Sequence, residues 1–483
     1  MIYKVIIFWI GSIVFTLWGL FACRANKAFV YVIFGLMIFA LTDPDNLSIT
    51  FFAHPDYKMA TRGFEIHLAD VCAFILFLHL WTTTPAGKLS FVPPLTLPQL
   101  LFILVAALSW LFASPAVTNP LAAMQSALTP DTLQYGYAME TVLELKLYPL
   151  FEISKLFRGL LIFWVCVNLS ADKNIIRTIY VVFSVLIIYF TIKSLILRYI
   201  MGVHRVTAGI GHYNNFNTFM GLMGAFLIPV AFSSKKFLIS GFMWFLVVCT
   251  VLCIILTISR SALAAFGIAM IVATPILLFK YMNAKNIFFL MCGGVACLAL
   301  LGKAHHTLME RFTIKNPTVA AFEGREALKN EARMMAMDYP FGVGMGNFSA
   351  WSILRYSAQT GAELGNFAHN SFYLTLGELG YPGLVAFWIF WLRYAQVGFI
   401  GLFYRLFSKD SFALSAMMGA NLSIIFLMPQ LWFQFTYRAT PIYLLVHIIL
   451  GIGVGQYLLA RRERIENALL ESRDQTYATQ HSR

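Results

Sequence analysis

Three arginines stand in short polar breaks between long apolar runs. Arg205 lies in VHRVTAGIGHYNNFN, Arg260 in LTISRSALAAF and Arg438 in FQFTYRATP. Placing a guanidinium in or close to the hydrocarbon layer of a membrane costs free energy. Such a group therefore usually faces a cavity, a partner or a substrate. The alternative is an arginine whose side chain extends to the lipid headgroups. The position of these arginines makes them candidates for a functional site.

A histidine and a carboxylate flank the start of a later apolar run, NFAHNSFYLTLGELGYPG. The imidazole of His369 can accept a proton near pH 7, which suits a general base, although a single histidine is often only a polar residue at the interface. Asn370 could hydrogen-bond to that histidine or to a sugar. Glu378 lies inside the apolar run, where a carboxylate is unusual, and could orient a partner or pair with an arginine.

A basic stripe precedes this histidine in GREALKNEARMMAMD, which is predicted to be helical. Arg325, Lys329 and Arg333 are spaced i, i+4, i+8 and therefore share one helix face. Such a face could bind phosphate. It could equally be a solvated face whose charges pair with Glu326 and Glu331.

The stripe runs into a glycine-rich segment, YPFGVGMGNF. Gly344 and Gly346 predict a turn in which backbone closely approaches other backbone or a ligand. The chain has no Walker motif, no H-E-x-x-H, no G-x-S-x-G and no Cys/His metal spacing. No motif therefore predicts a cofactor. Asp43 and Asp45 could ligate a divalent cation, but such a pair is more typical of a turn before an outward loop.

The elements that must position these residues are membrane helices. Apolar residues make up 59% of the 483 residues, charged residues only 12%, and the mean hydropathy is +0.74. A soluble protein carries about 25% charged residues. The net charge of +13 does not indicate nucleic acid, because the basic residues are scattered between apolar spans. In a membrane protein, an excess of basic residues is usually found in the cytoplasmic loops.

The apolar runs predict an all-α polytopic membrane protein with about 12–14 transmembrane helices and one large helical periplasmic loop. The expected spans begin near Val5, Ala28, Leu68, Leu100, Leu156, Ile179, Phe216, Phe237, Ala262, Ile287, Ser371, Phe412 and Ile442. The expected segments are N-terminal helices (1–200), core helices with outward-facing arginines (201–303), the loop (304–370), C-terminal helices (371–460) and a cytoplasmic tail (461–483).

The basic residues predict the orientation of these spans. Short loops rich in Lys and Arg stay in the cytoplasm, and the tail carries Arg461, Arg462, Arg464 and Arg473. Counting back from a cytoplasmic tail places the other basic loops inside and the loop 304–370 outside. We therefore expect Arg205, Arg260 and His369 to converge at one outward-facing cavity beneath that loop.

Taken in order, these motifs resemble the signature of the O-antigen ligase and O-antigen polymerase superfamily. That signature has an arginine that opens a helix in a large periplasmic loop, a Pro-x-Gly-x-Gly-x-Gly-like turn, a His-Asn pair and a Glu-x-Gly-x-x-Gly. The matching residues are Arg325, Pro340 with Gly342, Gly344 and Gly346, His369-Asn370, and Glu378 with Gly380 and Gly383. Upstream, SRSALAAF carries Arg260, and HRVTAGIGHYNNFN carries Arg205 with Asn215 or Asn217. The resemblance covers roughly residues 200–400.

The resemblance implies a glycosyltransferase of the bacterial inner membrane that needs no nucleotide and no metal. The donor would be a glycan on undecaprenyl diphosphate, and the acceptor a sugar hydroxyl on lipid A-core or on a growing polysaccharide. His369 would act as general base, and Arg205 and Arg260 would hold the diphosphate, for which the planar guanidinium is well suited. Substrate binding would involve Arg325, Arg333, Asn370, Glu378, Asn215 and the glycine turn.

Three functional hypotheses remain open at this point. The first is a ligase-like transferase, with an exopolysaccharide or O-antigen polymerase of the same superfamily as its close alternative. The second is a transporter of a lipid or polysaccharide, although the sequence shows no internal repeat and the polar residues gather on one side. The third is a scaffold in an export complex, which predicts that His369→Ala leaves function intact.

Overall fold

Long α-helices dominate the regular structure. The computed structural model describes residues 2–43, 46–51, 64–112, 140–313, 315–362, 366–408 and 410–481. The long helices are α1 (Ile2–Ala25), α2 (Ala28–Phe39), α3 (Leu68–Thr83), α4 (Thr96–Phe112), α8 (Glu140–Leu169), α9 (Lys173–Leu195), α10 (Tyr213–Ser233), α11 (Phe237–Leu256), α12 (Arg260–Tyr281), α13 (Ala284–Thr313), α14 (Lys315–Asp338), α17 (Ser371–Leu406), α18 (Ser411–Phe433) and α19 (Thr440–His481).

Short elements connect these helices. They are η1 (Ala40–Thr42), the antiparallel strands β1 (Ser48–Phe51) and β2 (Phe64–His67), η2 (Ala86–Lys88), η3 (Ile196–Ile200), α15 (Phe348–Trp351), η4 (Ser352–Tyr356), α16 (Ser357–Thr360) and η5 (Thr436–Arg438). In the described residues, the two-stranded hairpin is the only sheet.

A helix lies at each of the predicted membrane spans. Nine of the described helices are long and apolar enough to cross a membrane, and three shorter apolar helices cover Ala28–Thr42, Leu68–Thr83 and Thr96–Phe112. Each of the thirteen predicted starts falls in a different helix. The start near Leu156 lies in α8, which also carries several charged residues. The prediction of an all-α polytopic membrane protein is confirmed.

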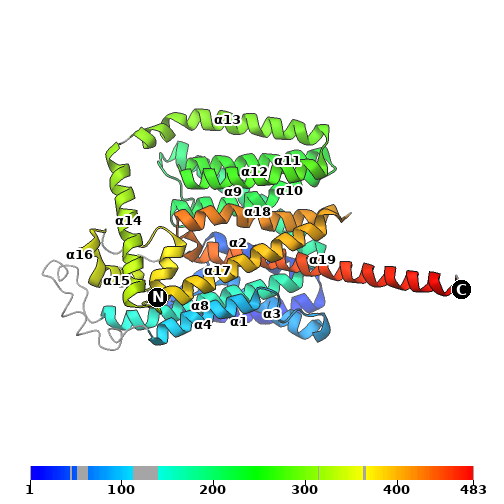
Figure 1. Cartoon of the computed structure of the whole chain (residues 1–483), viewed down its shortest axis with the longest axis horizontal. Helices are drawn as coiled ribbons and strands as arrows, with labels where there is room; N and C mark the ends of the chain where they lie inside the picture. The colour runs from blue at the N-terminus through cyan, green and yellow to red at the C-terminus, as the bar shows by residue number, and fades with distance from the viewer. Residues whose placement is uncertain are drawn as a thin grey trace.

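The helices lie roughly side by side, as Figure 1 shows, with α14–α16 gathered at one end and the last turns of α19 projecting from the other. The outermost helix, α13, packs against α11. It exposes apolar side chains that include Phe288, Met291, Val295 and Leu298. A helix with such an exposed apolar surface is typical of one that faces lipid.

The centre of the bundle is α10, which is buried along nearly its whole length between α18, α11 and α12. Its contact with α18 depends on a glycine. A Cβ atom at Gly419 would lie 2.5 Å from the carbonyl oxygen of Phe226. The two backbones therefore touch, as is common between membrane helices that carry small residues at their contact.

A second apolar cluster lies where α14 packs against α17, and it includes Leu328, Ala332, Phe348, Trp351 and Leu374. The helix predicted over GREALKNEARMMAMD is confirmed, since it forms the second half of α14. The first residues of the predicted loop 304–370 instead continue α13 as far as Thr313. This end of the molecule carries the arginines and the histidine singled out above.

Candidate functional site

A pocket of about 390 Å³ opens where the N-termini of α10 and α12 meet α14 and the C-terminus of α18. It is lined by Arg205, Tyr213, Asn214, Ser259, Arg260, Ser261, Ala264, Arg325, Phe433 and Gln434. We call it the arginine pocket, because every charged residue among these lining residues is an arginine. Helix N-termini also favour anions, because their backbone N–H groups carry partial positive charge. The pocket is therefore suited to a strongly anionic group.

Arg205 is held in place within its pocket wall. Its guanidinium lies 3.2 Å from the ring centroid of Tyr213, and its Nε donates a hydrogen bond to the carbonyl oxygen of Thr257 at 3.3 Å. An arginine stacked on an aromatic face loses less conformational freedom when it binds a ligand. Arg205 is thus preorganised, and its bond to Thr257 links its loop to the one that carries Arg260.

Both of these loops have strained backbone. Ala208 has φ +48°, three residues after Arg205, and Ile258 has φ +54°, two residues before Arg260. Positive φ is unusual for any residue with a side chain and is a clear outlier for a β-branched one. Such strain persists only where the surroundings impose it, and it is concentrated at functional sites.

His369 lies next to the segment that carries Gln434 of the arginine pocket. The centroid of its ring lies 5.4 Å from that of Phe435, which directly follows Gln434 in the chain. Burial, and then the positive charge of Arg325, lower the pKa of His369 to about 4, while the polar side chain of Gln434 acts in the opposite direction. The imidazole is therefore neutral at pH 7, which is the form that can accept a proton.

A second histidine lies beside the arginine pocket: the centroid of the His212 ring is 3.7 Å from that of Tyr213, the ring on which Arg205 stacks. His212 precedes α10, and its pKa is lowered to about 4 by burial, then by the charge of Arg205, then by His369. Arg205 and Arg260 both line the arginine pocket, and His369 lies beside Phe435, the residue that follows the lining Gln434.

Not all the predicted substrate-binding residues reach the pocket. Asn370 is buried and caps α17, since its side-chain oxygen accepts hydrogen bonds from the backbone N–H of Phe372 and Tyr373 at 2.9 and 3.1 Å. Asn215 is not among the lining residues, whereas its neighbour Asn214 is. The capping role explains the position of Asn370 without a substrate.

The basic stripe of α14 divides between two environments. Arg325 lines the arginine pocket, whereas Arg333 donates a hydrogen bond of 2.8 Å to the Tyr373 hydroxyl. Lys329 forms an ion pair with Glu326, as the solvated-face interpretation predicts. The pairing proposed for Glu331 is wrong: its carboxylate is buried and accepts a hydrogen bond from the Thr360 hydroxyl at 2.8 Å.

The glycine-rich turn binds backbone rather than lining the pocket. Gly342, Gly344 and Gly346 have φ of +85°, +95° and +91°. The N–H of Gly344 donates to the carbonyl oxygen of Glu378 at 2.9 Å. The turn therefore lies against α17, where Gly380 interrupts the helix with φ +65° and ψ −164°. Of the two alternatives in the sequence, approach to backbone is the one observed for Gly344.

Gly380→Ala is expected to destabilise the protein. Its Cβ would lie 1.9 Å from the carbonyl oxygen of Pro340 and 2.7 Å from the N of Gly342, both backbone atoms that cannot rotate away. The positive φ alone costs an alanine about 1–3 kcal/mol. Thermal unfolding in detergent should show the loss. Gly267→Ala, whose Cβ meets no atom within 4 Å, is the control and should unfold like the wild type.

Glu378 belongs to a buried ion network. Its carboxylate lies 2.8 Å from the guanidinium of Arg438, which also lies 3.0 Å from the carboxylate of Glu152. Lys155 pairs with Glu152 at 2.8 Å and donates a hydrogen bond to the carbonyl oxygen of Arg438 at 2.8 Å. Pairing of Glu378 with an arginine, one of the predicted roles, is confirmed. We call these four residues the ion quartet.

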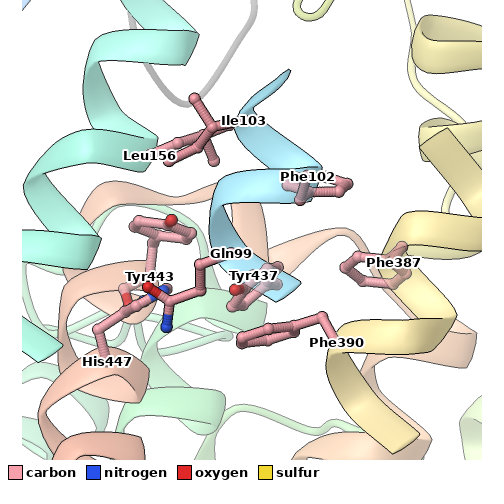
Figure 2. Close-up of a pocket in the computed structure, with 9 residues that line it drawn as sticks. All are labelled: Gln99, Phe102, Ile103, Leu156, Phe387, Phe390, Tyr437, Tyr443 and His447. Carbon is pink, nitrogen blue, oxygen red and sulfur yellow. The ribbon is translucent and has the colours of Figure 1, made fainter. Parts of the chain in front are cut away.

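A second cavity lies deeper among α4, α8, α17 and α19. Figure 2 shows Gln99 extending from α4 between Tyr437 and His447. The cavity has a volume of about 20 Å³ and is lined mainly by aromatic and aliphatic side chains. That volume accommodates about one water molecule. A sugar or diphosphate requires the much larger arginine pocket.

Several residues of the site were missed in the sequence, namely Tyr213, Asn214 and Gln434 in the pocket and His212 beside it. Three of them stand in the run HYNN, next to Arg205, so their proximity to that arginine was a usable signal. Gln434 follows an apolar span and carries no local signal of its own.

One comparison with known proteins finds a similarity to a family. Residues 245–388 match the family model described as O-antigen ligase. The matched segment includes Arg260, Arg325 and His369, whereas Arg205 and Gln434 lie outside it. No individual curated protein matches the chain. The match supports membership of the O-antigen ligase and polymerase superfamily and a function of that type.

Proposed function

Because residues 245–388 carry the sequence pattern of the O-antigen ligase family, we propose that this chain transfers a glycan from undecaprenyl diphosphate to a hydroxyl of an acceptor sugar. The reaction would take place at the outer, periplasmic face of the bacterial inner membrane. The observation that carries the proposal is the arginine pocket, in which Arg205, Arg260 and Arg325 surround one cavity beside a neutral histidine.

The arginines act on the leaving group. As the bond between the anomeric carbon and the diphosphate oxygen breaks, the electron pair and negative charge move to the diphosphate. Arg205 and Arg260 donate hydrogen bonds to its oxygens, and their fixed charge stabilises the transition state more than the ground state. Arg325, on α14, adds positive charge to the same pocket.

His369 acts on the acceptor. Its neutral ring takes the proton of the acceptor hydroxyl while the hydroxyl oxygen forms the new bond to the anomeric carbon. The products are the extended glycan and undecaprenyl diphosphate. The proton stays on His369 until water or the diphosphate removes it, so atoms and charge balance without a metal or nucleotide.

Donor and acceptor choice separates a ligase from a polymerase, and we favour the ligase-like reaction, with the polymerase as the alternative. Purified protein in detergent is given a lipid-linked oligosaccharide, first alone and then with lipid A-core. A ladder of longer lipid-linked chains with donor alone identifies a polymerase, and a single transfer only after addition of lipid A-core identifies a ligase. No product under either condition would overturn the proposed function.

Arg260→Gln is expected to lower the rate of transfer by about 10²–10³-fold, the usual effect of losing one donor that stabilises developing negative charge. Arg260→Lys retains the positive charge but not the planar guanidinium. Its rate of transfer should lie between those of the wild type and Arg260→Gln. The control is Arg355→Gln, since Arg355 is also exposed at this end of the molecule but pairs with Asp338. Equal losses in Arg260→Gln and Arg355→Gln would point to general surface charge rather than to the pocket.

A further inference from the structure

The loop that carries Arg205 joins α9 to α10 and has an unusual backbone. Its residues Gly202, Ala208, Gly209 and Gly211 have φ of +69°, +48°, +92° and +66°. Positive φ is strained for Ala208, and the glycines are free to adopt many other conformations unless contacts restrain them. The neighbouring helices must therefore impose the shape of this loop.

On one side, the loop is attached to the C-terminal end of α11. Nε of Arg205 donates to the carbonyl oxygen of Thr257 at 3.3 Å, and the N–H of Val206 donates to that of Leu256 at 3.4 Å. Both distances exceed the usual range of about 2.7–3.2 Å for an N–H···O hydrogen bond. These two bonds are therefore weak, and a second attachment is needed to fix the loop.

On the other side, Arg198 reaches the two residues that precede Arg205. Its Nη1 donates to the carbonyl oxygen of His204 at 2.6 Å and to that of Val203 at 3.3 Å, and it lies 3.4 Å from Nδ1 of His204. Arg198 stands in η3, the π-helical turn that ends α9. A hydrogen bond from a charged donor is roughly twice as strong as one between neutral groups. The short bond to His204 is therefore the stronger attachment of the loop.

Arg198 is also free to serve the loop alone. Among the described residues, its polar partners all belong to this loop. Lys193, also on α9, borders the same loop further along, where a Cβ atom at Gly209 would lie 3.0 Å from its Nζ. The hydrogen bond of Lys193, however, goes to the hydroxyl of Tyr189 in its own helix. Of the two cations, Arg198 is thus the one that holds the loop.

We propose that Arg198 is a positioning residue for Arg205: it fixes the loop just ahead of Arg205, so that this guanidinium already lines the arginine pocket when the diphosphate binds. The inference rests on the proposed function, in which Arg205 holds the donor. Groups that are ordered before binding lose less conformational freedom on binding. Arg198 is not among the residues that line the pocket, so it acts through the loop and not on the donor.

The kinetic test uses three variants. We expect Arg198→Gln to raise the donor KM about 3–20-fold, the effect of leaving a side chain and its loop to be ordered on binding, with kcat within about threefold. Arg198→Lys keeps a charged donor and should restore part of the affinity. Arg177→Gln is the matched control, because Arg177 lies at the other end of α9 and donates to the Asn174 side chain at 2.9 Å. An unchanged donor KM in Arg198→Gln, or an equal rise in Arg177→Gln, would overturn the inference.

A double variant tests whether Arg198 acts through Arg205. Binding of undecaprenyl diphosphate is measured for Arg205→Gln and for Arg205→Gln combined with Arg198→Gln. Once Arg205 is absent, its positioning no longer matters, so the second substitution should weaken binding by less than about twofold. If it weakens binding as much as it does in the wild type, Arg198 acts on the donor independently of Arg205 and is not a positioning residue.

A third measurement is independent of activity. Hydrogen–deuterium exchange of peptides that cover residues 199–212, followed by mass spectrometry in detergent, reports how often the loop opens. We expect faster exchange in Arg198→Gln than in the wild type, and wild-type exchange in Arg177→Gln. Equal exchange in all three proteins would overturn the inference. A wild type that transfers no glycan, while Arg198→Gln still shows faster exchange, would refute the proposed function and leave the role of Arg198 in the loop intact.

Discussion

His369→Ala is expected to lower the rate of transfer by about 10²–10⁴-fold, the range over which a general base contributes. Donor affinity should change little, because the diphosphate is bound by the arginines rather than by the imidazole. Initial rates of product formation and binding of the lipid-linked donor measure the two effects separately. His79→Ala, which removes a histidine from α3, is the control and should leave both unchanged. Loss of donor binding together with rate would show that His369 has a structural role.

The pH dependence of the wild type provides an independent check. Burial, and then the charge of Arg325, lower the pKa of His369 to about 4, so kcat/KM should remain level from roughly pH 8 to 5 and fall only as the pH approaches 4. A bound diphosphate stabilises the imidazolium, so the acid limb of kcat should lie at higher pH than that of kcat/KM. Arg325→Gln removes a positive charge and should move the acid limb of kcat/KM to higher pH. Limbs near pH 6.5 in both profiles and no effect of Arg325→Gln would contradict this assignment.

The helices could be predicted from the sequence because each depends only on the residues of its own segment. In lipid, the backbone N–H and C=O groups of a single long apolar run can form all their hydrogen bonds within that run only as an α-helix. Each such run therefore becomes a helix wherever it lies in the chain. The helix over GREALKNEARMMAMD and the position of His369 just before α17 could be predicted for similar reasons. The ends of α13 could not, since its polar last turns extend the helix beyond the apolar run.

The contacts that complete the site depend on residues far apart in the chain. Arg438 and Glu378 are separated by 60 residues, and Asn214 and Gln434 by 220, so no periodic pattern connects either pair. The sequence could place these side chains at the ends of spans, but the order in which helices pack decides which ends meet. For the same reason Asn214 rather than Asn215 faces the pocket: adjacent helical residues point about 100° apart, and only the packing of α10 selects between them.

Arg438→Met is expected to destabilise the protein by about 3–5 kcal/mol, since removal of one member of a buried ion pair leaves the others uncompensated. In the ion quartet, Glu152 and Glu378 would then face the single positive charge of Lys155. Thermal unfolding and the yield of monodisperse protein in detergent measure the loss. Lys173→Met is the control: Lys173 pairs with Asp410 at 2.9 Å, but at an exposed position, where such a pair contributes at most about 1 kcal/mol.

A double variant separates charge balance from packing. Glu378→Gln in the Arg438→Met background removes one charge of each sign and leaves Glu152 paired with Lys155, so part of the lost stability should return. If the quartet contributed only by filling space, the double variant would be as stable as Arg438→Met, because glutamate and glutamine have nearly the same volume. Because Arg438 also anchors the segment of Gln434, the double variant should recover its stability more fully than its transfer rate. Recovery of both to the same degree would show that the segment is held without the arginine.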